Sequence, residues 1–154
     1  MSYYFSYDAK ELNKDLKENL QQEDKELLYN KNKLHVTILY DKEDIADFEN
    51  LNAISFPNIK VKINNIVSWK GYDRYYLVAL IEDENLTKIH NELIKITGAK
   101  HSHEKFNPHI TLQSSINENE LVEKEKLSFL INKEITLNNF RLIDKGSSLK
   151  PKLK

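Results

Sequence analysis

The chain has 154 residues, of which 40% are hydrophobic and 31% are charged, with 3 glycines, 3 prolines and no cysteine. This length predicts a single domain over residues 1–154, and the composition excludes collagen-like chains, Gly/Pro-rich disorder, disulfides and zinc–thiolate sites. A formal net charge of -1 disfavours a sequence-independent nucleic-acid binder. The apolar runs are too short to span a membrane, and the N-terminus lacks the features of a signal peptide. We therefore expect a soluble cytoplasmic protein without a membrane partner.

The first half of the chain predicts short strands and one clear helix. An aromatic-rich strand over 2–7 precedes an amphipathic helix, in which Leu12, Leu16 and Leu20 recur every four residues and Asp8 is a candidate N-cap. A polar stretch follows, and then a strand over 34–40. A short helix or turn is expected around Phe48. Three further strands are expected over 59–63, 66–69 and 75–81, the last two joined by a turn containing Gly71.

The second half begins with the clearest helix, over 84–97. Its apolar face is formed by Leu86, Ile89, Leu93, Ile94 and Ile96, and Gly98 stands where a C′ glycine belongs. A polar loop over 100–107 leads to a strand over 109–112. Beyond it, the pattern predicts a helix near 118–126, strands over 127–131 and 135–142, and a frayed tail. The order of elements favours an α+β domain.

Two segments share the pattern His-apolar-Thr-apolar: residues 35–38 (HVTI) and residues 109–112 (HITL). They begin 74 positions apart, close to half the chain length. Because side chains alternate along a strand, His35 and Thr37 face one side and so do His109 and Thr111. Either motif alone is more simply a half-buried histidine beside a strand-forming threonine, but the matched pair favours a shared function.

A paired His/Thr set suits phosphodiester cleavage. One imidazole can remove a proton from the attacking oxygen while the other protonates the leaving oxygen, and both can do so near neutral pH. Two threonine hydroxyls can hydrogen-bond the nonbridging oxygens as charge develops there. This chemistry requires no metal or other cofactor. Lys70, Arg74 and Lys105 could neutralise phosphates, although a solvated surface charge is the simpler interpretation of each.

The chain resembles the 2H phosphoesterases, a family with two His-x-Thr/Ser motifs on pseudo-symmetric lobes. The resemblance covers most of the chain, and its most specific string is FNPHITL over residues 106–112. It implies a bilobal, pseudo-two-fold α+β fold with mainly antiparallel sheets lining a central cleft and helices outside. It also implies that His35 and His109 are the acid/base pair and that Thr37 and Thr111 orient the phosphate.

Within that superfamily the chain is most similar to the phage anti-CBASS nucleases, which degrade the cyclic oligonucleotide messengers of bacterial immunity. The resemblance implies that Tyr4 and Trp69 stack on bases, with Tyr3 or Tyr7 as substitutes for Tyr4. An acidic residue of the family near the C-terminus has no match here. We expect Phe106 and Lys105 to contact the same substrate, which would be a cyclic oligonucleotide or a short RNA. No stable protein partner is predicted, and a phage protein would act in the host bacterial cytoplasm.

Other interpretations remain open. RNA 2′,3′-cyclic phosphodiesterases and 2′,5′-oligoadenylate phosphodiesterases share the catalytic strings. A protein that sequesters a nucleotide without cleaving it would use the same aromatics but would not need both motifs, and an adaptor would leave the repeat as coincidence. His101, His103 and His109 have the spacing of a weak metal site. His90 is most simply a surface or boundary residue.

Overall fold

A computed structural model describes residues 3–28, 34–41, 48–99 and 105–144. The strands are β1 (Tyr3–Asp8), β2 (His35–Asp41), β3 (Ile59–Lys70), β4 (Tyr75–Ile81), β5 (His109–Ser115) and β6 (Glu134–Asp144). The helices are α1 (Leu12–Asn19), α2 (Gln22–Leu27), α3 (Phe48–Asn52) and α4 (Glu84–Thr97), with 3-10 helices η2 (Glu118–Glu120) and η3 (Lys124–Leu130).

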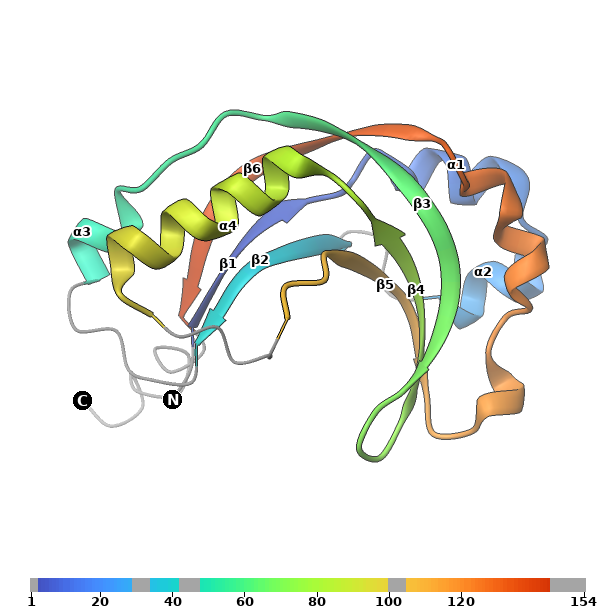
Figure 1. Ribbon diagram of the computed structural model, residues 1–154. Helices are drawn as coiled ribbons and strands as arrows, with labels where there is room; N and C mark the ends of the chain where they lie inside the picture. Colours follow the sequence, from blue (N-terminus) through green and yellow to red (C-terminus); the bar gives the residue numbers. More distant parts are fainter. Residues whose placement is uncertain (1–2, 29–33, 42–47, 100–104, 145–154) are drawn as a thin grey trace.

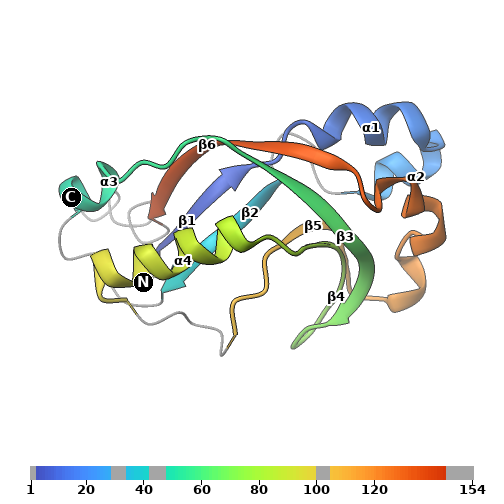
Figure 2. The same ribbon diagram turned by 45° about the horizontal axis from the view of Figure 1, so that its top comes forward.

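The strands form a closed antiparallel barrel in the order β1-β2-β5-β4-β3-β6. The two strands that carry the motifs, β2 and β5, meet at its centre, where Val36 lies opposite Ile110. On one side of this seam β2 pairs with β1, which pairs with β6. On the other side β5 pairs with β4, which pairs with β3. Helices α1 and α2 gather at one end of the molecule and α3 and α4 at the other (Figures 1 and 2). The expected α+β fold with mainly antiparallel sheets is confirmed.

One face of the central strands enters the hydrophobic core. Val36, Ile38, Ile110 and Leu112 are all fully buried, as strand alternation predicts. They belong to one cluster with buried leucines of α1 and α4, namely Leu12, Leu16, Leu86 and Leu93. The opposite face of β2 and β5 carries the half-buried histidines and threonines. Burying each large apolar side chain of β2 and β5 is worth about 1.5–3 kcal/mol. Because these side chains point into the core, the histidines and threonines between them must point to the opposite face.

A β-bulge interrupts each central strand at the same place. Phe5 pairs with Leu39 while Ser6 pairs with Thr37, so Ile38 is the extra residue in β2. Leu77 pairs with Gln113 while Val78 pairs with Thr111, so Leu112 is the extra residue in β5. Both strands show the same burial pattern as a result. Each bulge lies three residues beyond its histidine and reverses the facing of every residue after it.

Several expected elements differ from the observed ones. The segments 59–63 and 66–69 form one strand, β3, whose pairing shifts register between Ile63 and Asn65. The expected strand over 127–131 is wrong, because most of it lies in η3. Leu127 and Leu130, both buried, are three residues apart and share one face of a 3-10 helix. The expected helix near 118–126 is replaced by η2 and the start of η3, and α2 was not expected at all.

The longest helix, α4, has the expected bounds and is capped at both ends. The Asp83 carboxylate accepts hydrogen bonds from the backbone of Asn85 at 2.8 Å and of Leu86 at 3.2 Å. Gly98 ends the helix with φ 68, a left-handed conformation that favours glycine. Its buried face was partly mispredicted, since Ile96 is 50% exposed. Within the described residues no helix has the length and apolarity needed to cross a bilayer.

Candidate active site

The two motifs meet on the exposed face of the β2–β5 seam. His35, Thr37, His109 and Thr111 are all half-buried. Because the strands are antiparallel and Val36 lies opposite Ile110, Thr37 is next to His109 and His35 is next to Thr111. The structure therefore brings the four residues singled out by the sequence into one cluster, although they lie in two segments far apart in the chain.

The ring of His109 is held in a defined tautomer. Its Nδ1 lies 2.9 Å from the Asn107 carbonyl oxygen. Since a carbonyl oxygen only accepts hydrogen bonds, Nδ1 is the protonated nitrogen in this contact. The Trp69 ring packs edge-on against this imidazole, with a centroid distance of 4.6 Å and an interplanar angle of 69°. Both contacts restrict the orientation of the imidazole.

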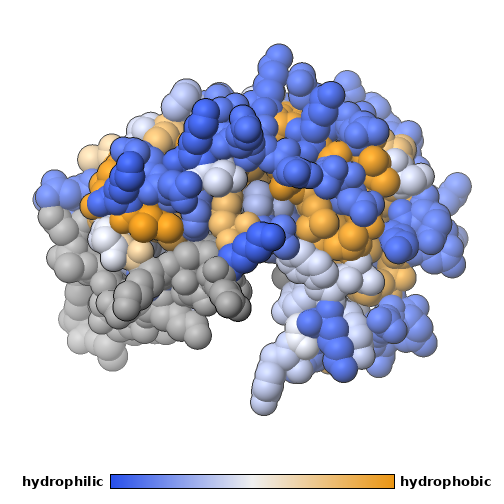
Figure 3. All heavy atoms as spheres, in the orientation of Figure 1, coloured by the Kyte–Doolittle hydropathy of each residue, from blue (hydrophilic) through white to orange (hydrophobic). Residues whose placement is uncertain are grey.

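A pocket of about 500 Å³ lies over this half of the cluster. It is lined by Thr37, Tyr40, Trp69, Lys105, Phe106, Asn107 and His109. Its volume is in the range of small-ligand sites, which are about 300–1,000 Å³. The molecular surface is hollowed beside the β3–β4 hairpin in the space-filling view (Figure 3). Trp69, Phe106 and Lys105, three of the residues singled out from the sequence, thus line one pocket with His109.

Tyr4 lies beside the other histidine. It is half-buried in β1, and its ring centroid is 5.9 Å from that of His35, with an interplanar angle of 33°. Burial is the main cause that raises the pKa of Tyr4 above its usual value of 10.0. Tyr3 and Tyr7, the alternatives considered from sequence, are buried in the core. Each histidine thus has an aromatic neighbour, Tyr4 for His35 and Trp69 for His109.

Tyr40 is a pocket residue that sequence patterning missed. Strict alternation from His35 would place Tyr40 on the core face with Val36. The bulge at Ile38 reverses this, so that Tyr40 joins Thr37 in lining the pocket. No local sequence signal marks the bulge, because Ile38 and Leu39 are ordinary strand residues.

His90 is a second residue that sequence patterning misplaced. It is 5% exposed, rather than a surface or boundary residue, because it lies on the same face of α4 as Leu86 and Leu93. Its Nδ1 donates a hydrogen bond of 2.7 Å to the carbonyl oxygen of Ile38, the bulged residue. Its ring stacks on Phe106 at a centroid distance of 4.1 Å and an angle of 3°. His90 thus connects the β2 bulge to the segment that leads into His109.

Asp8 was expected to cap α1, but the N-cap of that helix is Glu11. Asp8 instead ends β1, where it pairs with His35 and lies on the same face of the sheet. It is 4% exposed. One carboxylate oxygen accepts a hydrogen bond of 3.0 Å from Arg141 Nη2, and the other accepts one of 2.8 Å from Asn139 Nδ2. These partners lie more than 130 positions away in β6, so only the tertiary structure reveals the contact.

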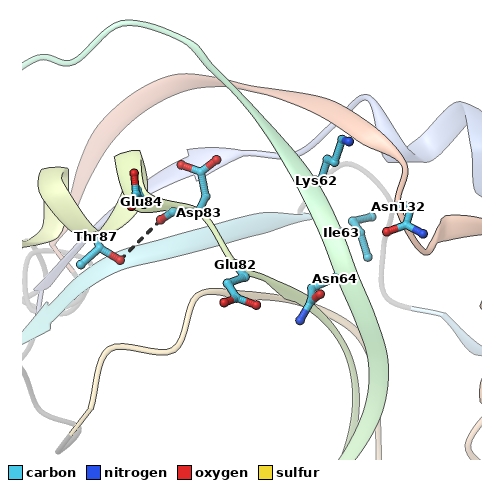
Figure 4. A pocket seen from close by; sticks show the side chains of 8 residues that line it. All are labelled: Lys62, Ile63, Asn64, Glu82, Asp83, Glu84, Thr87 and Asn132. Carbon is cyan, nitrogen blue, oxygen red and sulfur yellow. Dashed lines mark hydrogen bonds between the residues drawn. The ribbon is translucent and has the colours of Figure 1, made fainter.

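A second pocket, of about 520 Å³, lies at the start of α4 and contains no motif residue. Glu82, Asp83 and Glu84 contribute three carboxylates to it, and the Thr87 hydroxyl bonds the Asp83 carbonyl oxygen (Figure 4). Three acidic residues against one lysine of the lining, Lys62, disfavour binding of a phosphodiester there. No group of three metal-ligating side chains occurs in the part of the chain that the structure describes. His101 and His103, two of the three residues with metal-like spacing, lie outside that part.

Comparison with known proteins bears on the family and the fold of the chain. The model of the family described as "Anti-CBASS protein Acb1" matches residues 2–139. A search of curated proteins finds no match. Among solved structures, TT0787 of Thermus thermophilus is similar with a TM-score of 0.60 at 16% identity, over 94% of this chain and 88% of that one. A structure described as a phosphoesterase gives a TM-score of 0.59 at 19% identity, over 91% and 85%. LigT of E. coli in complex with 3′-AMP gives 0.57 at 17% identity, over 91% and 85%.

Proposed function

The chain belongs to the Acb1 family of anti-CBASS proteins and has the 2H phosphoesterase fold, and we propose that it cleaves small cyclic oligonucleotides. The family and the fold together support phosphodiesterase activity. In this proposal the substrates are cyclic di- or trinucleotide messengers of bacterial immunity, and the chain is a phage nuclease that removes them in the host cytoplasm. The observation that carries the proposal is the cluster of both His-x-Thr pairs at one seam, beside a pocket with aromatic walls.

The proposed reaction is an in-line displacement at phosphorus. One histidine accepts the proton of the ribose 2′-hydroxyl, whose oxygen forms a bond to phosphorus as the bond to the leaving oxygen breaks. The other histidine donates its proton to that leaving oxygen, so the product is a ring-opened nucleotide with a 2′,3′-cyclic phosphate. Thr37 and Thr111 donate hydrogen bonds to the nonbridging oxygens. On a 2′,3′-cyclic end, water would be the nucleophile instead.

The bases would be held by stacking. Trp69 and Phe106 line the pocket beside His109, and Tyr4 lies beside His35. Stacking of a base on an aromatic side chain is worth about 1–3 kcal/mol and tolerates every base. Lys105, at the same pocket, supplies a positive charge for the phosphate. This arrangement explains how a chain of net charge -1 could bind an anionic ligand.

The test is cleavage of a panel of substrates in excess EDTA. The panel holds cyclic di- and trinucleotides, a linear 2′–5′ oligoadenylate and an RNA with a 2′,3′-cyclic end. We expect the cyclic messengers to be opened, and His35→Ala or His109→Ala to abolish turnover while circular dichroism stays unchanged. Asn91→Ala, at an exposed position of α4, is the matched control. Cleavage of the linear substrates alone would refute the messenger assignment, and tight binding without cleavage would favour a sequestering protein.

A further inference from the structure

The His/Thr cluster has a cation at each end of β5, and the proposed reaction uses only one of them. Lys105 lines the pocket beside His109, at the start of the strand. At the other end, beyond Thr111, the Nη1 atom of Arg74 donates a hydrogen bond of 3.0 Å to the Ser114 hydroxyl. Arg74 follows the loop of the β3–β4 hairpin, so a different lobe element delivers this second charge.

The anchor of Arg74, Ser114, lies on the same face of the sheet as the cluster. Leu112 is the extra residue of the β5 bulge, so Ser114 is half-buried like Thr111 and shares its face. The burial pattern of β2 is the same, and Tyr40 holds the corresponding position there and lines the pocket. Ser114 is thus the counterpart of Tyr40 in the other lobe. It cannot form an aromatic wall, and it accepts a guanidinium instead.

The bond to Ser114 turns the Arg74 side chain toward the cluster. Tyr76 is the cross-strand partner of Ser114. Arg74 stands two residues before Tyr76, so it lies on the same face but one step further from the cluster. Its side chain must therefore run back along β5 to reach Ser114. Since strand residues rise about 3.3 Å each, Ser114 is at most about 10 Å from Thr111.

The turn that carries Arg74 is held in a fixed shape. The backbone N–H of Gly71 donates a hydrogen bond of 2.7 Å to the Arg74 carbonyl oxygen. A Cβ atom at Gly71 would lie 2.6 Å from Cε2 of Tyr76, because the tyrosine ring packs directly against the turn. The hairpin borders the hollow of the molecular surface (Figures 1 and 3). An ordered starting point reduces the entropy that the arginine loses when it binds a ligand.

The chemistry of Arg74 favours a phosphate. The ion pairs among the described residues involve other side chains, so no carboxylate in that part of the chain neutralises this guanidinium. Arg141, the other arginine, is by contrast paired with the buried Asp8. The bond to Ser114 uses one of the five N–H donors of Arg74, and four remain. A planar, charged fork of donors matches two oxygens of a phosphate at once.

We propose that Arg74, positioned by Ser114, binds a second phosphate of the ligand, next to the phosphate that Thr37 and Thr111 hold. The inference rests on the proposed function, because it concerns the same ligand. A ligand with one phosphate fills only the cluster. A cyclic di- or trinucleotide has one phosphate for each nucleotide, so it reaches Arg74 as well. Arg74 thus favours ligands with several phosphates through binding rather than through the cleavage step.

The test measures binding to the whole chain by titration calorimetry. The two ligands are the cyclic dinucleotide of 2′-deoxyadenosine, with two phosphates, and linear d(ApA), with one. Neither has a 2′-hydroxyl, so the proposed reaction cannot consume them. We expect Arg74→Gln to weaken binding of the ring about tenfold and of d(ApA) less than about twofold. Arg74→Lys keeps the charge without the fork, and its loss should be intermediate. Lys95→Gln, which removes a positive charge from an exposed position of α4, is the matched control and should change neither affinity.

Steady-state cleavage of a cyclic dinucleotide gives a second readout. Because Arg74 acts in binding, Arg74→Gln should raise KM about tenfold and leave kcat within about twofold. Ser114→Ala removes the anchor but no charge, so it should raise KM by a smaller factor. Circular dichroism of each variant should match that of the unaltered chain, because the altered contact lies at an exposed position.

Four outcomes would overturn the inference. Equal losses for the ring and for d(ApA) in Arg74→Gln would show that Arg74 acts on the phosphate in the cluster. No loss for either ligand, or an unchanged KM, would show that Arg74 is a solvated surface charge. Each of these results leaves the proposed function intact as long as the cyclic messengers are opened. Failure of both ligands to bind, together with no cleavage of the substrate panel, would remove the proposed function and this inference with it.

Discussion

Replacement of His90 by Phe tests whether a buried histidine outside both motifs holds the site together. Phe keeps a ring that can stack on Phe106 but removes the Nδ1 donor to Ile38, a bond of 2.7 Å. The carbonyl oxygen of Ile38 would then be buried without this partner. Leaving a buried acceptor unsatisfied costs about 1–3 kcal/mol, and we expect His90→Phe to lower the free energy of unfolding by that amount.

His90→Ala removes the ring as well. The lost aromatic pair adds about 0.5–1.5 kcal/mol, so the total loss should be about 1.5–4.5 kcal/mol. Urea unfolding followed by circular dichroism measures both variants, with the exposed Asn91→Ala as the control on the same helix. Because the Ile38 bulge places Tyr40 in the pocket, the rate of substrate cleavage should fall in His90→Phe as well. A His90→Phe protein within about 0.5 kcal/mol of the unaltered chain would refute this reasoning, since the carbonyl would then contribute less than any typical buried acceptor.

Three further predictions concern stability. Burial lowers the pKa of His90 below its usual 6.5, so the folded state favours the neutral ring. The contribution of the neutral ring to the free energy of unfolding is therefore complete above pH 6.5 and is lost as pH falls through the folded-state pKa. The urea midpoint should fall below pH 6.5, with a smaller fall in His90→Phe; equal falls in both would contradict this origin. Ser6 Oγ is fully buried and has no hydrogen-bond partner within the described residues. Ser6→Ala should therefore leave the thermal unfolding midpoint unchanged or raise it, and a clear drop would show that this hydroxyl makes a hydrogen bond in the folded protein. Gly98→Ala forces an alanine to φ 68 and should cost about 1 kcal/mol in urea unfolding; no loss would mean that the helix ends differently.

The sequence by itself determined the class of fold and singled out the four residues of the His/Thr cluster. Alternation along two short strands placed His35 with Thr37 and His109 with Thr111, and the apolar residues between them are buried as expected. A local signal also predicted the C-terminal end of α4, because a C′ glycine acts on backbone groups within a few residues. Such signals work because their physical cause lies in the same segment of chain.

The tertiary structure decided what depends on pairing between distant strands. The bulge at Ile38 brings Tyr40 into the pocket, although alternation within β2 would exclude it. His90 is polar and so gave no core signal, yet it lies on the buried face of α4 and bonds a carbonyl 52 positions away. Asp8 meets Arg141 across 133 positions, since β1 and β6 become neighbours only when the barrel closes. Register, bulges and barrel closure follow from the packing of the whole chain, and no local stretch of sequence contains them.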